Sequence, residues 1–146
     1  MKSIFEKANY EELERRLQSL TATSKSLWGK MNVAQMLHHL NLTMEAPMGK
    51  YKTIGKPVFF MKIFKSVLYN DKPFGKSAPT PKDYKIKDSF NFDIEKQKAF
   101  SNLKEIYERG LHASYLPHVF FGNLTNEQWG QHFYKHTDHH LKQFGL

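Results

Sequence analysis

Residues 134–146, YKHTDHHLKQFGL, place His136, His139 and His140 close together near the end of the chain. Imidazole nitrogens bind transition metals and exchange protons near neutral pH, so such a cluster can form a metal site. The alternative is a polar helix end, in which each histidine is satisfied by a backbone carbonyl or by water. The position of each histidine around the helix bears on this choice.

A helix over this segment places two of the histidines on its apolar face. With a rotation of about 100° per residue, an arc of about 80° contains Trp129, Phe133, His136, His140 and Phe144. The opposite, solvent side is expected to carry Gln131, Lys135, Asp138 and Lys142. Histidines four positions apart have Cβ atoms about 5–6 Å apart, which suits two nitrogens that bind one ion. His132 and His139 lie on the flank of the apolar arc, so His139 is the weaker candidate ligand.

A third ligand must come from another part of the chain, where His38 and His39 form the other adjacent pair, in AQMLHHL. The apolar arc of that segment contains Val33, Met36, Leu37, Leu40 and Met44. Both histidines lie away from the centre of this arc, and the periodicity favours His39 without deciding the question. The C-terminal motif is not of the peptidase type, because HTDHH lacks the glutamate that follows the first histidine in HExxH.

Composition narrows the chemistry further. The chain contains no cysteine, which excludes a thiolate metal site and a cysteine nucleophile, so histidines or carboxylates must hold any transition metal. The net charge of +8 raises the question of nucleic acid. The lysines concentrate between residues 50 and 98 without the basic helix of a DNA-binding module, so a solvated lysine-rich loop is favoured. A non-specific nucleic-acid binder is the minority alternative.

Four long helices are expected to position the histidines. Three of the expected starts pair a capping residue with Glu or Gln three positions later: Asn9 with Glu12, Asn32 with Gln35, and Thr125 with Gln128. The second helix is expected to end near Pro47, and the third to run from Asp93 to Gly110. The sequence therefore predicts an all-α fold, a four-helix bundle that forms a single domain over residues 1–146.

An insertion separates the second and third predicted helices. A short helix is expected over residues 57–69, and a long loop over residues 70–92. We expect this loop to cross the open end of the bundle near the histidines, because long loops in compact domains are often functional. The alternative is a connector that merely joins the two ends of the bundle.

Two segments of the sequence resemble a known superfamily. AQMLHHL after LWGKMN, together with KHTDHHLKQFG, resembles the DinB/YfiT-like superfamily of metal-binding four-helix bundles, and the resemblance covers most of the chain. SAPTP, LPHVFFGNLTNEQWG and HHLKQFG look like a bacterial branch whose domain has no assigned function. The resemblance implies a DinB-like domain in which His39 from the second helix and the pair His136 and His140 bind a divalent metal.

The same resemblance bears on activity, since some members of the superfamily are thiol transferases and many have no assigned reaction. Our hypothesis is a small metal-dependent enzyme, a transferase or hydrolase of a small molecule that uses zinc, nickel or iron, with catalytic residues not identified. Tyr134, Glu45 and His118 are candidate substrate or outer contacts, although a role of His118 in capping its own turn is favoured. The alternative is a non-enzymatic binding or stress-response bundle in which the metal is structural or absent.

The remaining expectations concern partners and compartment. The charged N-terminus does not read as a signal peptide, and the most apolar stretch, VFFMKIFKSVLY, is interrupted by Lys62 and Lys65. We therefore expect no membrane span and a cytoplasmic protein. The expected partner is a small-molecule substrate rather than nucleic acid, and a homodimer is left open.

Overall fold

The computed structural model describes residues 1–51, 70, 72–76 and 86–146. In these ranges the regular elements are α1 (Lys7–Gln18), α2 (Val33–Glu45), α4 (Phe92–Arg109), the 3₁₀ helix η3 (Gly110–His112) and α5 (Asn126–Gln143). The described ranges contain no strand, only an isolated bridge between His118 and Gly122. The prediction of an all-α protein is therefore confirmed. The short helix predicted at residues 57–69 lies outside the described residues, as does much of the predicted loop at residues 70–92.

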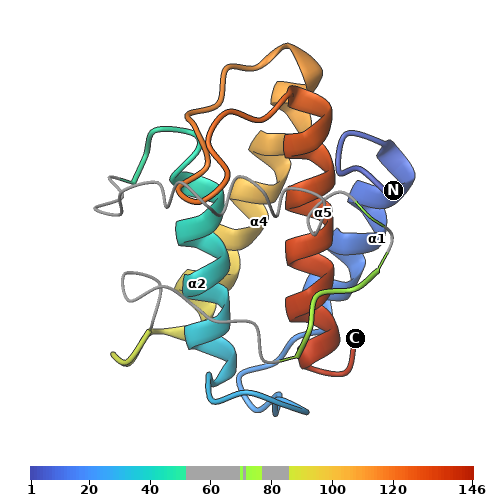
Figure 1. Ribbon diagram of the computed structural model, residues 1–146. Coiled ribbons are helices and arrows are strands. Elements are labelled where there is room, and N and C mark those ends of the chain that lie inside the picture. Colours follow the sequence, from blue (N-terminus) through green and yellow to red (C-terminus); the bar gives the residue numbers. More distant parts are fainter. Residues whose placement is uncertain (52–69, 71, 77–85) are drawn as a thin grey trace.

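The four α-helices pack side by side around a shared core. Figure 1 shows this arrangement, in which α2 contacts α4 and α5, and α1 contacts the same two helices. Fully buried apolar side chains from every helix meet in the middle, among them Leu13, Leu17, Met36, Leu37, Leu40, Leu103, Ile106 and Leu141. Burial of one such side chain contributes about 1.5–3 kcal/mol to folding, so this core fixes how α2 and α5 face each other.

Local capping sets where the two helices that bear the histidines begin. Asn32 accepts from the backbone N–H of Gln35, whose side chain accepts from the backbone N–H of Asn32, and this reciprocal pair starts α2. Thr125 and Gln128 form the same capping box at the start of α5. Both predicted capping boxes are confirmed, and they set where each of the two helices begins.

The predicted start of the first helix is wrong. Its N-cap is Glu6 rather than Asn9, and Asn9 lies buried inside α1. The Asn9 amide group donates to the Ser3 carbonyl at 3.0 Å and to the Glu6 carboxylate at 2.9 Å. The N-terminal segment folds back over α1, with Ile4 donating to the Gly130 carbonyl on α5 at 3.1 Å, and it supplies acceptors that the local pattern did not reveal.

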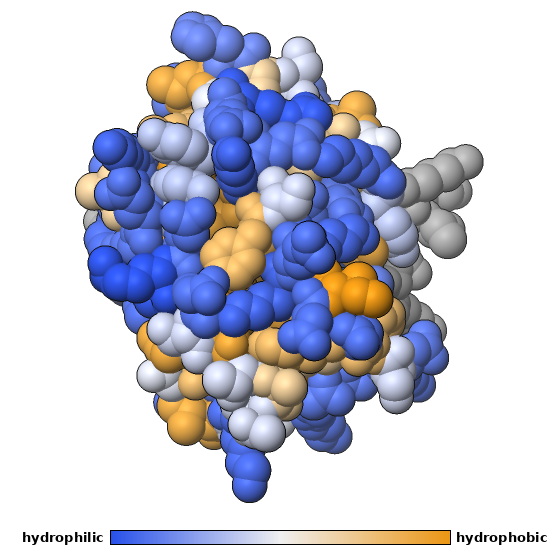
Figure 2. Space-filling model, turned by 180° about the vertical axis from the view of Figure 1, so that it is seen from behind, coloured by the Kyte–Doolittle hydropathy of each residue, from blue (hydrophilic) through white to orange (hydrophobic). Residues whose placement is uncertain are grey.

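The outer surface of the described chain is mostly polar. Figure 2 shows the face seen from behind, which is largely hydrophilic, with apolar side chains in small separate groups. None of the described helices is both long enough and apolar enough to cross a membrane.

Candidate metal centre

His39 of α2 and the pair His136 and His140 of α5 meet between these two helices. Each offers a ring nitrogen, and the ligand atoms of the three lie within 4.8 Å of one another. The Nε2 atoms of His39 and His136 are 3.4 Å apart. The ring centroids are separated by 5.2 Å for His39 and His136, 4.8 Å for His39 and His140, and 4.7 Å for His136 and His140. The structure thus brings together the three histidines that the sequence singled out.

Burial favours the neutral form of His136 and His140. His39 and His140 are only 6% and 7% exposed, and His136 is partly buried. Burial, followed by the neighbouring His140 and His39, lowers the pKa of His136 well below its usual value. Burial, followed by the neighbouring His39, lowers the pKa of His140 to about 3. At neutral pH both rings therefore have an unprotonated nitrogen, which is the form that binds metals.

The geometry of the cluster fits a transition metal. Two nitrogens that bind a tetrahedral ion at about 2.0–2.1 Å lie about 3.3–3.4 Å apart, which matches the 3.4 Å between the Nε2 atoms of His39 and His136. The group contains no carboxylate or thiolate, so the donor set is three neutral imidazoles. Such a set suits zinc, nickel or iron and leaves at least one coordination position for another ligand.

Two hydrogen-bonding partners of the cluster were missed by the sequence analysis. The Thr43 hydroxyl lies 3.3 Å from Nδ1 of His136, and the Gln143 amide oxygen lies 2.9 Å from Nδ1 of His140. Thr43 and Gln143 lie four residues after His39 and three after His140, which is the spacing of neighbours on one helix face. That spacing is the signal that could have identified them.

The described part of the insertion lies beside this cluster. The Phe74 ring centroid is 6.5 Å from that of His136 and 5.7 Å from that of His139. The Lys135 ammonium donates to the Asn70 carbonyl at 2.9 Å and lies 4.7 Å from the Phe74 ring centroid. Lys135 is only 8% exposed, which corrects the expectation that it faces solvent. The position of Phe74 is the one expected for a loop near the histidines, and the role of that loop stays a prediction.

The rings of His132 and His118 lie next to the cluster, one after the other. The His132 ring stacks on that of His136 with centroids 5.7 Å apart, and the His118 ring lies 4.8 Å from that of His132. Nδ1 of His118 accepts from the backbone N–H groups of Phe120 and Phe121, so His118 caps its own turn as favoured from the sequence. Burial lowers the pKa of His118 to about 2 and that of His132 to about 4.

The other candidate contacts lie in separate networks. The Tyr134 hydroxyl donates to the Glu12 carboxylate at 3.1 Å. The Glu45 carboxylate accepts from Asn102 at 3.1 Å and pairs with Lys98 at 3.0 Å. Neither Tyr134 nor Glu45 belongs to the group of described residues that could hold an ion.

The two histidines expected not to be ligands also have other surroundings. The Nδ1 atom of His38 lies 3.0 Å from the Glu95 carboxylate of α4, and its ring stacks on Phe90 with centroids 3.8 Å apart. The His139 ring packs beside Trp28, with centroids 6.1 Å apart. Among the described residues, the group that could hold an ion includes neither His38 nor His139.

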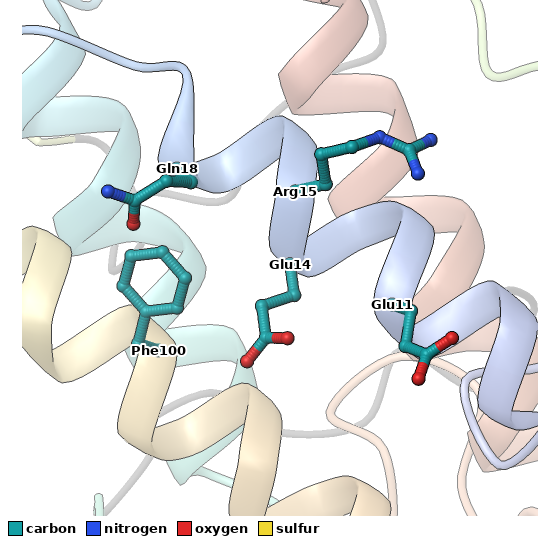
Figure 3. Close-up of a pocket in the computed structure, with 5 residues that line it drawn as sticks. All are labelled: Glu11, Glu14, Arg15, Gln18 and Phe100. Carbon is teal, nitrogen blue, oxygen red and sulfur yellow. The ribbon is translucent and has the colours of Figure 1, made fainter.

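An open groove lies elsewhere, between α1 and α4. It has a volume of about 490 Å³ and is lined by Glu11, Glu14, Arg15, Gln18 and Phe100. Figure 3 shows Glu14 and Gln18 near the Phe100 ring, with Glu11 and Arg15 directed away from it. None of the clustered histidines lines this groove, so we do not assign it to the metal chemistry.

A family model described as "Protein of unknown function (DUF1569)" matches residues 5–145. No curated protein and no solved structure matches the chain significantly.

Proposed function

The chain belongs to the DUF1569 family, and we propose that this member binds a divalent transition metal through His39, His136 and His140. The observation that carries the proposal is the convergence of three ring nitrogens within 4.8 Å, from two helices. An isolated buried histidine is commonly satisfied by a carbonyl or by water. Three imidazoles whose nitrogens converge at this spacing favour a shared ion, because unprotonated ring nitrogens at such distances can bind one cation together.

We further propose that the metal centre is catalytic. A bound divalent ion with an open position would lower the pKa of a water or thiol there and so supply a nucleophile near neutral pH. The chain's own contribution is to hold three neutral nitrogens in place, with the apolar Phe74 ring beside the cluster. This arrangement favours a transferase or hydrolase of a small molecule over an assembly or scaffolding role.

The proposed reaction class and relationship rest on the resemblance to the DinB/YfiT-like superfamily. The shared elements are one histidine on the second helix and an HxxxH pair on the last, and the fold of the described chain is compatible with them. A thiol-dependent transfer is one form of this proposal, because some members of the superfamily are thiol transferases. The competing proposal is a non-enzymatic bundle that uses the metal only for stability.

Elemental analysis of protein purified without a histidine tag tests the metal proposal directly. We expect about one transition-metal ion per chain, as for a single mononuclear site. Protein that remains free of metal after incubation with zinc, nickel and iron(II) would overturn it. The metal-loaded protein should then be assayed with a panel of low-molecular-weight thiols and electrophiles, against His136→Ala as the control. Equal rates for the two proteins would favour the non-enzymatic alternative.

A further inference from the structure

Gln143 connects the metal cluster to the loop before α2. Gln143 is buried, with only 4% of the residue exposed. The amide nitrogen donates to the Trp28 carbonyl at 2.7 Å, and the amide oxygen lies 2.9 Å from Nδ1 of His140. The backbone of the same residue accepts from the Leu27 N–H at 2.7 Å. Gln143 is thus held on both its backbone and its side chain.

These contacts determine where the His140 proton resides. A backbone carbonyl can only accept, so the Gln143 atom that faces Trp28 must be the NH₂ group. The Gln143 atom that faces His140 is then the oxygen, which also can only accept. Nδ1 of His140 must therefore be the donor and carry the proton. In a neutral ring this leaves the Nε2 atom unprotonated.

Thr43 constrains His136 by the same reasoning. Its hydroxyl donates its one proton to the Leu40 carbonyl at 2.9 Å. The hydroxyl oxygen can then only accept from Nδ1 of His136, 3.3 Å away. His136 therefore also carries its proton on Nδ1, and its free Nε2 is the atom that faces Nε2 of His39.

We infer that Gln143 and Thr43 are positioning residues that hold His140 and His136 in the Nδ1–H form, so that Nε2 of each ring faces the centre. The inference rests on the proposed function for its purpose, because histidine ligands of metals donate their second ring N–H to a partner that fixes orientation. The hydrogen-bond assignment itself depends only on the contacts in the chain.

The loop before α2 also helps to orient Gln143. Gly29 has φ of +83°, and a Cβ at this position would collide with the Gln143 amide nitrogen. The close approach of this loop backbone is what places the Trp28 carbonyl against Gln143. A residue that does not itself touch a histidine, Gly29, is therefore required for the orientation of His140.

The test reads the protonated nitrogen directly in metal-free protein. Two-bond ¹H–¹⁵N correlation spectra distinguish Nδ1–H from Nε2–H histidines by their nitrogen shifts, and we expect the Nδ1–H form for His136 and His140. Gln143→Met and Thr43→Val remove the acceptors with little change of volume and should shift these rings toward a mixture of the two forms. Thr43→Ser restores an acceptor and should restore the Nδ1–H form of His136. Wild-type rings protonated on Nε2, or spectra unchanged in Gln143→Met and Thr43→Val, would overturn the inference.

Metal affinity is the second measurement. We expect Gln143→Met and Thr43→Val to weaken binding of cobalt(II) about 10–100-fold, the usual effect of losing such a partner, and to alter its visible spectrum. Lys142→Ala, at an exposed position next to Gln143, is the matched control and should bind as the wild type does. Affinities and spectra in the acceptor-free variants equal to those of wild type would also contradict the positioning role. If the wild-type rings carry the expected protons but bind no metal, the proposed function fails and the positioning inference stands.

Discussion

The Nε2 atoms of His39 and His136 lie 3.4 Å apart across the interface between α2 and α5. In the arrangement derived above Nε2 of His136 is the unprotonated nitrogen, so it can accept from an Nε2–H of His39 or bind an ion together with His39. The pair therefore links the packing of two helices to the capture of a cation.

Single substitutions of histidines should distinguish the metal ligands from histidines that do not bind the metal. His136→Ala and His140→Ala should each abolish stoichiometric metal, because a site with two histidines and no carboxylate holds an ion weakly. His139→Ala should retain most of it, and His38→Ala likewise. The measurement is metal content after gel filtration. Loss of metal in His139→Ala with retention in His140→Ala would mean that the rotational phase assigned to the ligands of α5 is wrong.

Acidification should release the metal and weaken the metal-free fold. Burial lowers the pKa of His140 to about 3 and that of His132 to about 4, whereas both start from 6.5 in the unfolded chain. Between these values the unfolded state binds protons that the folded state excludes, so the free energy of unfolding falls as pH decreases below about 6.5. Urea titrations of metal-free protein at pH 7.5 and 5 should show this loss. The exposed-site variant His112→Gln serves as the control, and an urea midpoint that does not change with pH would contradict the expectation.

Gly29→Ala should weaken metal binding, although residue 29 does not contact the histidines. The new methyl group would displace the Gln143 amide, and alanine at a positive φ adds a backbone cost of about 1–2 kcal/mol. Gly110→Ala is the matched control, because Gly110 has φ of +59° but no atom within 4 Å of an added Cβ. Isothermal titration with zinc should show a loss of affinity for the first variant alone. Equal affinities for both would mean that the loop backbone does not control the site.

The polar contacts between α2 and α4 should affect stability but not metal content. Asn41 is fully buried, donates to the Glu95 carboxylate at 2.8 Å and accepts from Asn102 at 3.1 Å. Asn41→Ala leaves both partners without this contact and should lower the free energy of unfolding by about 1–3 kcal/mol. Gln97→Ala, at an exposed position on α4, should change it little. A drop in zinc stoichiometry in folded Asn41→Ala would show that the two networks are coupled.

Phe74 should slow the exit of a bound ion. Its ring lies beside His136 and His139, and the Lys135 contacts with Asn70 and Phe74 hold this segment against α5. Phe74→Ala should release metal to a chelator faster at unchanged stoichiometry, because water and chelator then approach more freely. Lys104→Ala, on the exposed side of α4, is a suitable control. An unchanged release rate would support the interpretation of the loop as a connector.

Local signals in the sequence predicted the helices that matter most for the site. The capping boxes at Asn32 and Thr125 involve residues three positions apart, so the sequence carries all the information needed to recognise them. Asn9 shows the same spacing to Glu12, yet the folded-back N-terminus draws its side chain to Ser3 and Glu6. A local pattern cannot reveal an acceptor that a tertiary contact supplies.

The candidate site was predictable to a similar extent. Helical periodicity predicted which α5 histidines share a face, whereas it could only favour His39 over His38. The structure distinguishes these two by the partner of His38, Glu95, which lies 57 residues away on α4. Lys135 was expected in solvent because its position on the helix does not reveal Asn70, a residue distant in sequence whose carbonyl accepts from the Lys135 ammonium. Contacts between residues far apart in the sequence could not be predicted from local patterns.

The long sequence separation of His39 and His136 bears on how fast the protein would be degraded in the cell. His39 and His136 are 97 positions apart, so an ion shared between them would act as a cross-link that closes most of the chain into one loop. The free energy of metal binding then becomes part of the free energy of folding, as in other proteins that bind an ion only when folded. Chains that had lost the ion would open more often, and proteases act on opened chains. The amount of this protein would accordingly follow the supply of its metal, even without any change in its synthesis.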